Sequence, residues 1–311
     1  MGTERTPQRP EKRTWRSRLI RYSLRGMFVL VFVVCALLAA YVWLLQDFYE
    51  QKAIARELQE GVQCQLSWRS EYGEGSKTKP GWLQQWLMNL VGDDPSSQLV
   101  GIYCRPVDGD QLDLVLDGAE RSPHLKNLDI DGRLDRFRAI PRISRLTLAG
   151  VFDDRIVQEV GRHESLEALV IFDKTLRRDR TDGVSRNLQP LANLQNLRRL
   201  ELYGFEANDE CMSAIAQLRL LEHLDLSGAD VADADFTKLK HLPNLKSLTL
   251  PASPITDDAI AMLAELKQLK ALGLDHVLTR GPLEWSPEQL KLLQVALPNA
   301  KIYHGRDLID R

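Results

Sequence analysis

The chain has 311 residues, of which 44% are hydrophobic and 27% charged, an ordinary composition for a folded protein with one large or two modest domains. Its formal charge of −2 argues against a general binder of nucleic acids or acidic substrates. The four cysteines are too few for a disulfide scaffold, and no C-x-x-C pair indicates zinc.

The N-terminus is basic and is followed by an apolar run. Residues 1–25 carry eight Lys or Arg against two Glu, whereas the rest of the chain carries 33 basic and 41 acidic side chains. The next twenty residues, GMFVLVFVVCALLAAYVWLL, lack any charge, so we predict a transmembrane helix over 26–46. A cleaved signal peptide is the alternative, but Leu38 stands where cleavage needs a small residue. The positive-inside bias predicts a single-pass protein of the cell membrane, with a cytoplasmic N-terminus and the remainder outside the cytoplasm.

Helix-forming residues without Gly or Pro continue over 47–61, which predicts a helical stalk. The region 62–120 then contains two expected strands, VQCQLSW at 62–68 and LVGIYC at 99–104, and an expected apolar-rich helix at 82–91. Cys64 and Cys104 fall on these two strands. They form a disulfide in an exported compartment, or remain two buried thiols in the cytosol.

Four segments near the C-terminal end repeat the pattern L-x-x-L-x-L at intervals of 24 residues, beginning at 197, 221, 245 and 269. Weaker copies begin at 125, 143 and 166. Equal intervals of this length indicate leucine-rich repeats, in which each unit supplies one strand. Behind the strands, apolar triplets with the spacing i, i+3, i+6 predict a short helix in each unit. These triplets are Met212, Ile215, Leu218; Phe236, Leu239, Leu242; and Ile260, Leu263, Leu266.

The predicted fold is therefore an α/β leucine-rich repeat solenoid, a horseshoe with one strand and one helix per unit, behind an N-terminal transmembrane helix. The repeats with their C-terminal cap occupy 121–304, and 305–311 form a tail. Since the first repeat of a solenoid would otherwise expose its core, 62–120 is interpreted as the N-terminal cap.

Acidic residues also recur with the repeat, at Asp209, Asp233 and Asp257. Each precedes an expected helix, where a short acid caps free backbone N–H groups. We interpret these residues, and the pair Asp153 and Asp154, as helix caps and not as catalytic carboxylates.

One interval, from Leu166 to Leu197, is seven residues longer than the period. The extra residues lie within 173–187, in a basic stretch that includes Arg177, Arg178 and Arg180. Insertions in repeat arrays form loops, often on the binding side. This stretch is either a solvated charge run or a contact loop.

Because the leucines face inward, the residues between them line the concave face in three rows. The rows begin at Asn127, Asp129 and Asp131, and the third passes through Phe172, Tyr203 and Ser227. Arg and Tyr are favoured anchors at protein interfaces. The predicted partner-binding residues are Phe172, Arg177, Arg178, Arg180, Arg199, Glu201, Tyr203, His223 and Asp225.

The sequence indicates no enzyme, metal site or cofactor. One histidine with two carboxylates on flat neighbouring strands, as at His223, is a poor metal site. No P-loop, G-x-S-x-G, H-E-x-x-H or dinucleotide-binding glycine pattern occurs, and Cys211 on a return helix is interpreted as a packed thiol.

Several segments together resemble the membrane-anchored leucine-rich repeat proteins that occur in large paralogous sets in some bacteria. They are RYSLRG before the apolar run, the GW-x-x-x-W…GDD element, and the unit ITDDAIAMLAELKQLKAL. The resemblance implies binding or scaffolding at the cell envelope, without a defined ligand. The repeat unit is also similar to the arrays of F-box-associated substrate receptors, but no F-box segment is visible.

The sequence leaves three candidate functions open. The first is a non-catalytic, membrane-anchored protein that binds another protein at the cell envelope. The second is a structural envelope component that associates with copies of itself, and a remote third is a substrate-receptor-like adaptor. No nucleic acid is expected as a partner.

Overall fold

The structure is a computed structural model of the full chain, and it describes residues 24–69, 85, 88–89, 97–140, 142–174, 187–231, 233–250, 257–274, 286–304 and 307–308. The chain divides into two compact units, Met1–Asp47 and Phe48–Arg311. The basic arm and most of the helix expected at 82–91 lie outside the described residues.

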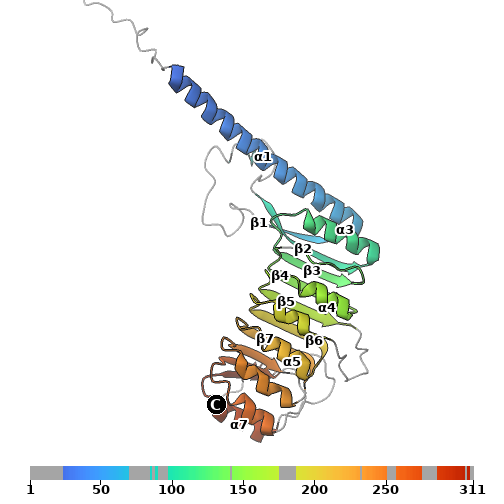
Figure 1. The fold of residues 1–311 in the computed structure, drawn as a ribbon, viewed down its shortest axis with the longest axis vertical. Helices are drawn as coiled ribbons and strands as arrows, with labels where there is room; N and C mark the ends of the chain where they lie inside the picture. Colours follow the sequence, from blue (N-terminus) through green and yellow to red (C-terminus); the bar gives the residue numbers. More distant parts are fainter. Residues whose placement is uncertain are drawn as a thin grey trace, which may run out of the picture. The chain divides into compact units, whose positions relative to one another are not determined.

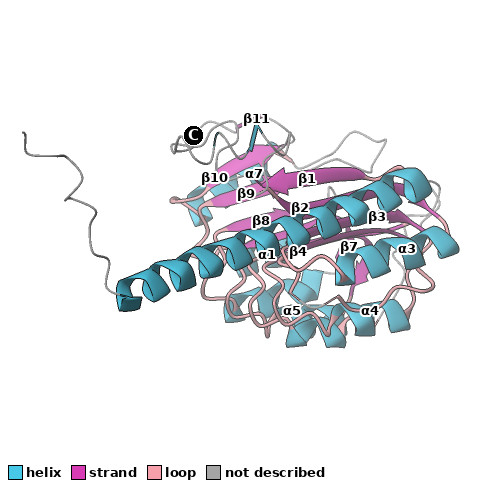
Figure 2. Cartoon of the chain, turned by 90° about the horizontal axis from the view of Figure 1, so that it is seen from above, coloured by secondary structure: helices cyan, strands magenta, loops and turns pink. Residues whose placement is uncertain are grey.

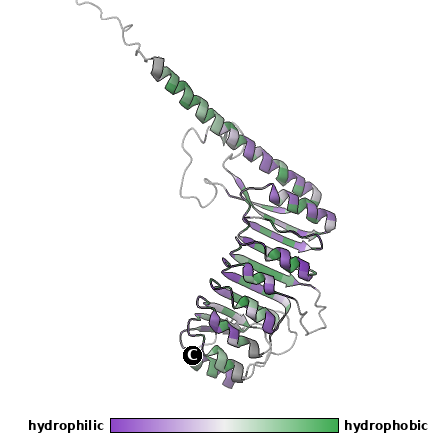
Figure 3. Ribbon diagram, in the orientation of Figure 1, coloured by the Kyte–Doolittle hydropathy of each residue, from purple (hydrophilic) through white to green (hydrophobic). Residues whose placement is uncertain are grey.

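The first unit contains the apolar part of helix α1, which runs from Leu24 to Val62. Its large apolar side chains, from Met27 to Trp43, are exposed. Figure 3 shows the hydrophobic colouring of this part of α1. By length and composition, α1 is the one helix among the described residues that is able to cross a membrane. Apolar helices of this kind near an N-terminus serve as membrane anchors or as signal sequences.

The second unit is an α/β repeat fold built on one sheet, whose strands follow one another in chain order from β1 to β11 (Figure 1). Strands β2 to β10 are parallel, and β1 and β11 close the two ends in antiparallel pairing. The strands are β1 Gln65–Arg69, β2 Gln98–Val107, β3 Asn127–Gly132, β4 Arg145–Gly150, β5 Ala168–Asp173, β6 Arg199–Ala207, β7 His223–Val231, β8 Ser247–Leu250, β9 Ala271–Leu274, β10 Lys301–His304 and β11 Asp307–Leu308.

The predicted leucine repeat is confirmed as the core of this sheet. The first residue of every L-x-x-L-x-L copy is buried, as are the two that follow on the strand, for example Leu221, Leu224 and Leu226. The strands are aligned by the same hydrogen bonds in successive units: the backbone N–H groups of Glu222 and His223 both donate to the carbonyl of Arg198. Burial of the leucines thus fixes one face of the sheet and the register of every strand.

Short helices cover the leucine side of the sheet (Figure 2). They are α3 Gly109–Glu120, α4 Asp154–Val160, the 3₁₀ helix η2 Gln189–Asn193, α5 Asp209–Ile215, the 3₁₀ helix η3 Asp233–His241, α6 Asp257–Leu263 and α7 Pro287–Ala296. All three predicted apolar triplets are buried. Two units, however, use a 3₁₀ helix, because the spacing i, i+3, i+6 also suits three residues per turn.

The helix caps differ from the sequence expectation by one position. Asp153 caps α4 as predicted, its carboxylate accepting from the N–H of Ile156. In α5 the cap is Asn208, which accepts from the N–H of Cys211, and Asp209 is already the first helical residue. Asp209 was therefore wrongly predicted as the cap, although its charge still favours the positive end of the helix.

The C-terminal half of α1 belongs to the second unit, as part of the cap. Its residues Ile54, Leu58 and Val62 are buried in the repeat core, and Gln51 Oε1 accepts a hydrogen bond of 2.6 Å from the backbone N–H of Leu99 in β2. The helix predicted over 47–61 is present as the end of α1, and from Phe48 onward it belongs to the second unit.

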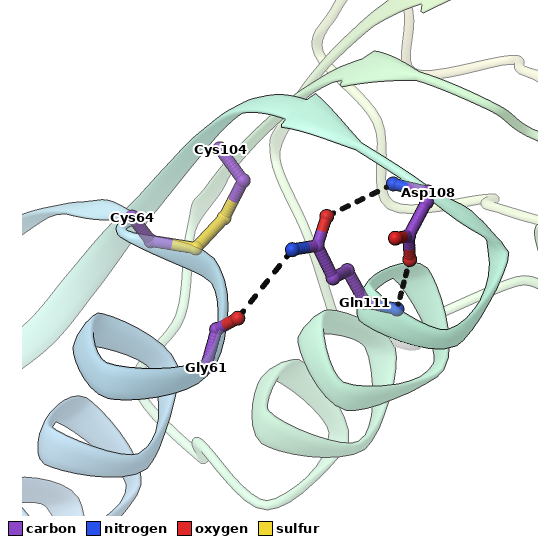
Figure 4. The surroundings of a disulfide bond; sticks show 5 residues. All are labelled: Gly61, Cys64, Cys104, Asp108 and Gln111. Atoms are coloured by element: carbon purple, nitrogen blue, oxygen red, sulfur yellow. Dashed lines mark hydrogen bonds between the residues drawn. A yellow bond between two sulfur atoms is a disulfide. The ribbon is translucent and has the colours of Figure 1, made fainter.

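A disulfide joins this cap to the first parallel strand. Cys64, just after α1, and Cys104, in β2, are bonded, with their Cα atoms 4.4 Å apart (Figure 4). Beside it, Gln111 accepts from the N–H of Asp108 and donates to the carbonyl of Gly61, so one amide ties the start of α3 to the end of α1. Cys35 and Cys211 take no part in a disulfide.

Close stacking of the units requires glycine at the end of one strand. Gly204 in β6 has φ = +82°, and a Cβ atom there would lie 2.3 Å from the carbonyl oxygen of Asp173 in β5. Both the backbone conformation and the contact exclude a side chain.

Gly204→Ala is expected to destabilise the repeat domain by at least about 1–2 kcal/mol, because the left-handed backbone alone costs that much. The measurement is thermal unfolding of the full chain in detergent, followed by circular dichroism. Gly109→Ala is the matched control: Gly109 opens α3, and its added Cβ would meet nothing closer than 3.8 Å. Equal melting temperatures for the two variants would contradict this account of Gly204.

His163, between α4 and β5, is a buried neutral hydrogen-bonding group. Its Nε2 accepts from the backbone N–H of Ile140 at 2.9 Å, which leaves Nδ1 to donate to the carbonyls of Glu159 and Val160, each at 3.1 Å. Burial lowers the pKa of His163 below its ordinary value, because charge is costly there. Protonation of Nε2 would also break the bond to Ile140.

This predicts a loss of stability in mild acid. Since the folded pKa lies below the unfolded value of about 6.5, the contribution is complete above that pH and declines as the pH falls below it. Wild-type protein should unfold at lower urea at pH 5.5 than at pH 7.5, and His163→Asn should reduce that difference. An unchanged difference in the variant would exclude His163 as its source.

Candidate functional site

The face of the sheet opposite the helices, the concave face, is lined by the rows predicted from the repeat. The pairing runs Asn127, Arg145, Ala168, Arg199, His223, Ser247, Ala271 for the first row, and Asp129, Thr147, Val170, Glu201, Asp225, Thr249, Gly273 for the second. The structure extends the second row to Tyr103 in β2 and Tyr303 in β10.

Six predicted residues come together on three adjacent strands, β5 to β7 (Figure 1). We call them the β5–β7 patch: Phe172, Arg199, Glu201, Tyr203, His223 and Asp225. The rings of Phe172 and Tyr203 stack face to face, with centroids 4.1 Å apart and planes within 5°. Phe172 is 39% exposed, so part of the stacked pair is open to solvent.

Two carboxylates lie next to the hydroxyl group of Tyr203. Its hydroxyl oxygen lies 3.3 Å from Glu201 Oε2 and 3.3 Å from Asp225 Oδ2. Arg199 pairs with the second oxygen of Glu201 at 3.2 Å. A phenol has one proton to donate, so at any moment one of the two carboxylates faces the lone pairs of the Tyr203 oxygen.

The electrostatics of the patch keep Tyr203 and His223 neutral. Burial, followed by the charges of Asp225 and Glu201, raises the pKa of Tyr203. Burial, followed by the positive charge of Arg199, lowers the pKa of His223. The patch at neutral pH is therefore two acids and one arginine around uncharged rings.

The third row departs from its predicted course at β7. Glu201 pairs with Asp225, but Tyr203 pairs with Gly228, so β7 holds one extra residue. The N–H of Ser227 donates to Asp225 Oδ1 at 2.9 Å within this bulge. Ser227, predicted on the concave surface, is only 6% exposed and lies within reach of the Tyr203 hydroxyl at this bulge.

Other predicted site residues lie elsewhere. Arg177, Arg178 and Arg180 are outside the described residues. Cys64 and Cys104 are in the cap, three strands from β5.

A second charged cluster, which the sequence interpretation did not single out, lies on β2 to β5. Arg105 pairs with Asp129 at 2.8 Å, and Lys174, directly after β5, pairs with Asp131. The pairing of β2 with β3 joins residues 26 apart, such as Tyr103 and Asp129, so the 24-residue period gave no signal for this ion pair. Within the described ranges, no group of three His, Cys, Asp or Glu is placed to hold a metal ion.

Comparison with known proteins identifies no family: no protein-family model matches this chain, and neither does any curated protein. Among solved structures, the chain is similar to an internalin from Listeria monocytogenes, with 17% identity over 50% of this chain and a TM-score of 0.30. It is also similar to TLR13 in a TLR13–ssRNA13 complex (18% identity, 64% of this chain, TM-score 0.37) and to a Bacteroides fragilis protein (23%, 61%, 0.35). The matches span 56%, 31% and 48% of those three chains.

Proposed function

We propose that the protein is a non-catalytic, membrane-anchored receptor or adaptor, which binds another protein through the β5–β7 patch of its concave face outside the cytoplasm. The observation that carries the proposal is the convergence of an exposed aromatic ring, an arginine and two acids on adjacent strands. Aromatic residues and arginine at the centre of a surface are typical anchors of protein interfaces.

The location rests on three features of the N-terminal half. The exposed apolar helix follows a basic arm, which favours retention of that arm in the cytoplasm. The cap contains a disulfide, and disulfides persist in oxidising compartments. Helix α1 is continuous from the apolar segment to Val62, so the proposed anchor and the first part of the cap share one helix.

A structural envelope component is the second candidate, and one observation favours it. Leu292 and Val295 on α7 are 50% and 75% exposed, one helical turn apart, at the C-terminal end of the array. An exposed apolar pair at the end of a solenoid suits contact with another copy.

Site-specific photocrosslinking in cells that make the protein separates these functions. A photoreactive phenylalanine replaces Phe172 on the concave face or, as the control, exposed Gln158 on α4 of the helical side. We expect one dominant foreign protein crosslinked from position 172 and little from position 158. Crosslinks only to a second copy of the chain would support the structural component, and equal foreign yields from both positions would contradict binding at the patch.

A further inference from the structure

Strand β5 presents only apolar side chains to the concave face, and all three are at least partly exposed. Strands β4 and β6 beside it both present polar side chains in the first two rows. An apolar stripe near the middle of the array is therefore bordered by polar groups, an arrangement typical of protein interfaces. We call its side toward β4 the β4–β5 surface, which consists of Arg145, Thr147 and Ala149 on β4 and Ala168, Val170 and Phe172 on β5.

The ring of Phe172 leaves one face turned toward β4, because its other face stacks on Tyr203 of β6. The register partner of Phe172 on β4 is Ala149, whose single methyl group covers little of a ring. Val151, which follows β4 directly, is 61% exposed. Contact with an apolar side chain would remove this aromatic and aliphatic surface from water, which is favourable.

Arg145, in the first row of the same surface, is an exposed cation. Within the ranges that the structure describes it forms no ion pair. The other cations near β5 are engaged: Arg105 with Asp129, Lys174 with Asp131, and Arg199 with Glu201. The stretch that follows β5 in the sequence is also basic and adds charge of the same sign. An incoming carboxylate would therefore meet a free guanidinium at Arg145.

The spacing of the two features restricts the partner. Neighbouring rows of the concave face are two residues apart along a strand, about 6.6 Å. Side chains on one face of an extended segment have that same spacing, so a segment that lies along β5 matches successive rows with successive side chains. An apolar residue over Val170 and Phe172 then places a carboxylate two residues away within reach of the long Arg145 side chain.

We infer that the β4–β5 surface binds an extended segment of the partner protein, with an apolar side chain packed on Phe172 and Val170 and a carboxylate paired with Arg145. This inference rests on the proposed function and specifies the chemistry of the partner. The stack of Phe172 on Tyr203 holds the ring in position for the contact, so the surface is partly organised before the segment binds.

The test uses full-length protein in detergent micelles and the peptide acetyl-Gly-Leu-Ser-Glu-Gly-amide. In two further versions, serine replaces the leucine or glutamine replaces the glutamate, and all are also made with leucine and glutamate exchanged, because a segment is able to lie along β5 in either direction. Proton NMR reports affinity and the upfield ring-current shift that Phe172 induces in the leucine methyl protons. In one of the two orders, we expect the parent peptide to bind about three- to fivefold more tightly than its glutamine version, the strength of one exposed ion pair.

Two variants and a matched control assign the contacts. Phe172→Ala should abolish the ring-current shift, and Arg145→Gln should remove the preference for glutamate while the shift remains. Lys301→Gln is the control, because Lys301 is another exposed cation of the first row, on β10. Equal binding of the glutamine version to the wild type, or equal loss of the preference in Lys301→Gln, would overturn the inference.

An oligothymidylate of ten nucleotides tests another source of negative charge and stacking rings. A phosphate chain needs several free cations, and the acids on β3 and β6 beside this surface disfavour it. Tighter binding of this oligonucleotide than of the parent peptide, with loss of that binding in Arg145→Gln, would overturn a protein segment as the occupant.

The photocrosslink from position 172 separates failure of this inference from failure of the proposed function. If that crosslink captures a foreign protein and Arg145→Gln leaves the capture unchanged, the carboxylate contact is overturned and the protein-binding function stands. If Arg145→Gln removes the capture while Lys301→Gln does not, the contact is supported in the cell. The expected peptide results without any captured protein would support the chemistry of the surface and contradict the proposed function.

Discussion

The structure depends on covering the first layer of its hydrophobic core. A stack of repeats exposes apolar side chains at each end, and an uncovered end costs roughly 25 cal/mol for each Å² of apolar surface left in water. Here the cover is the end of α1, whose Ile54, Leu58 and Val62 are buried against the sheet, together with β1 and the Cys64–Cys104 disulfide. The helix that carries the apolar N-terminal segment is thus also the helix that completes the fold, so removal of residues 48–62 should damage the repeats themselves.

Burial of the leucines also decides what the concave face presents. Successive side chains of a strand point to opposite faces of the sheet, so the residues between the buried leucines face the concave side. The parallel register of the strands then aligns these residues in rows. The β5–β7 patch arises where this regularity yields an aromatic pair beside two acids. An irregularity, the extra residue in β7, lies in the same patch, where Ser227 is buried beside Tyr203. The regular units form the scaffold. The side chains and the bulge that differ between units give the patch its chemical character.

Sequence periodicity predicted the fold well, because the leucines that recur every 24 residues are the residues buried on the helix-covered face of the sheet. For the same reason it placed the six residues of the β5–β7 patch in their rows on neighbouring strands. It did not predict the bulge in β7 or the burial of Ser227, because one inserted residue in a strand leaves the leucine spacing intact. The spacing of three could not distinguish η2 and η3 from α-helices. The hydrogen bond between Gln51 and Leu99 joins residues 48 apart in the sequence, and local sequence patterns do not predict contacts of this kind.

The proposed location of the disulfide-closed repeat domain is outside the cytoplasm, behind an N-terminal anchor. This location is tested by counting the reactive thiols of the chain. Intact cells are lysed into denaturant with a polyethylene-glycol maleimide, with and without prior reduction, and the gel shift of the full chain counts reactive cysteines. The account predicts two adducts without reduction, at Cys35 and Cys211, and four after it. Four adducts without reduction would place the cap in a reducing compartment and contradict the proposed location.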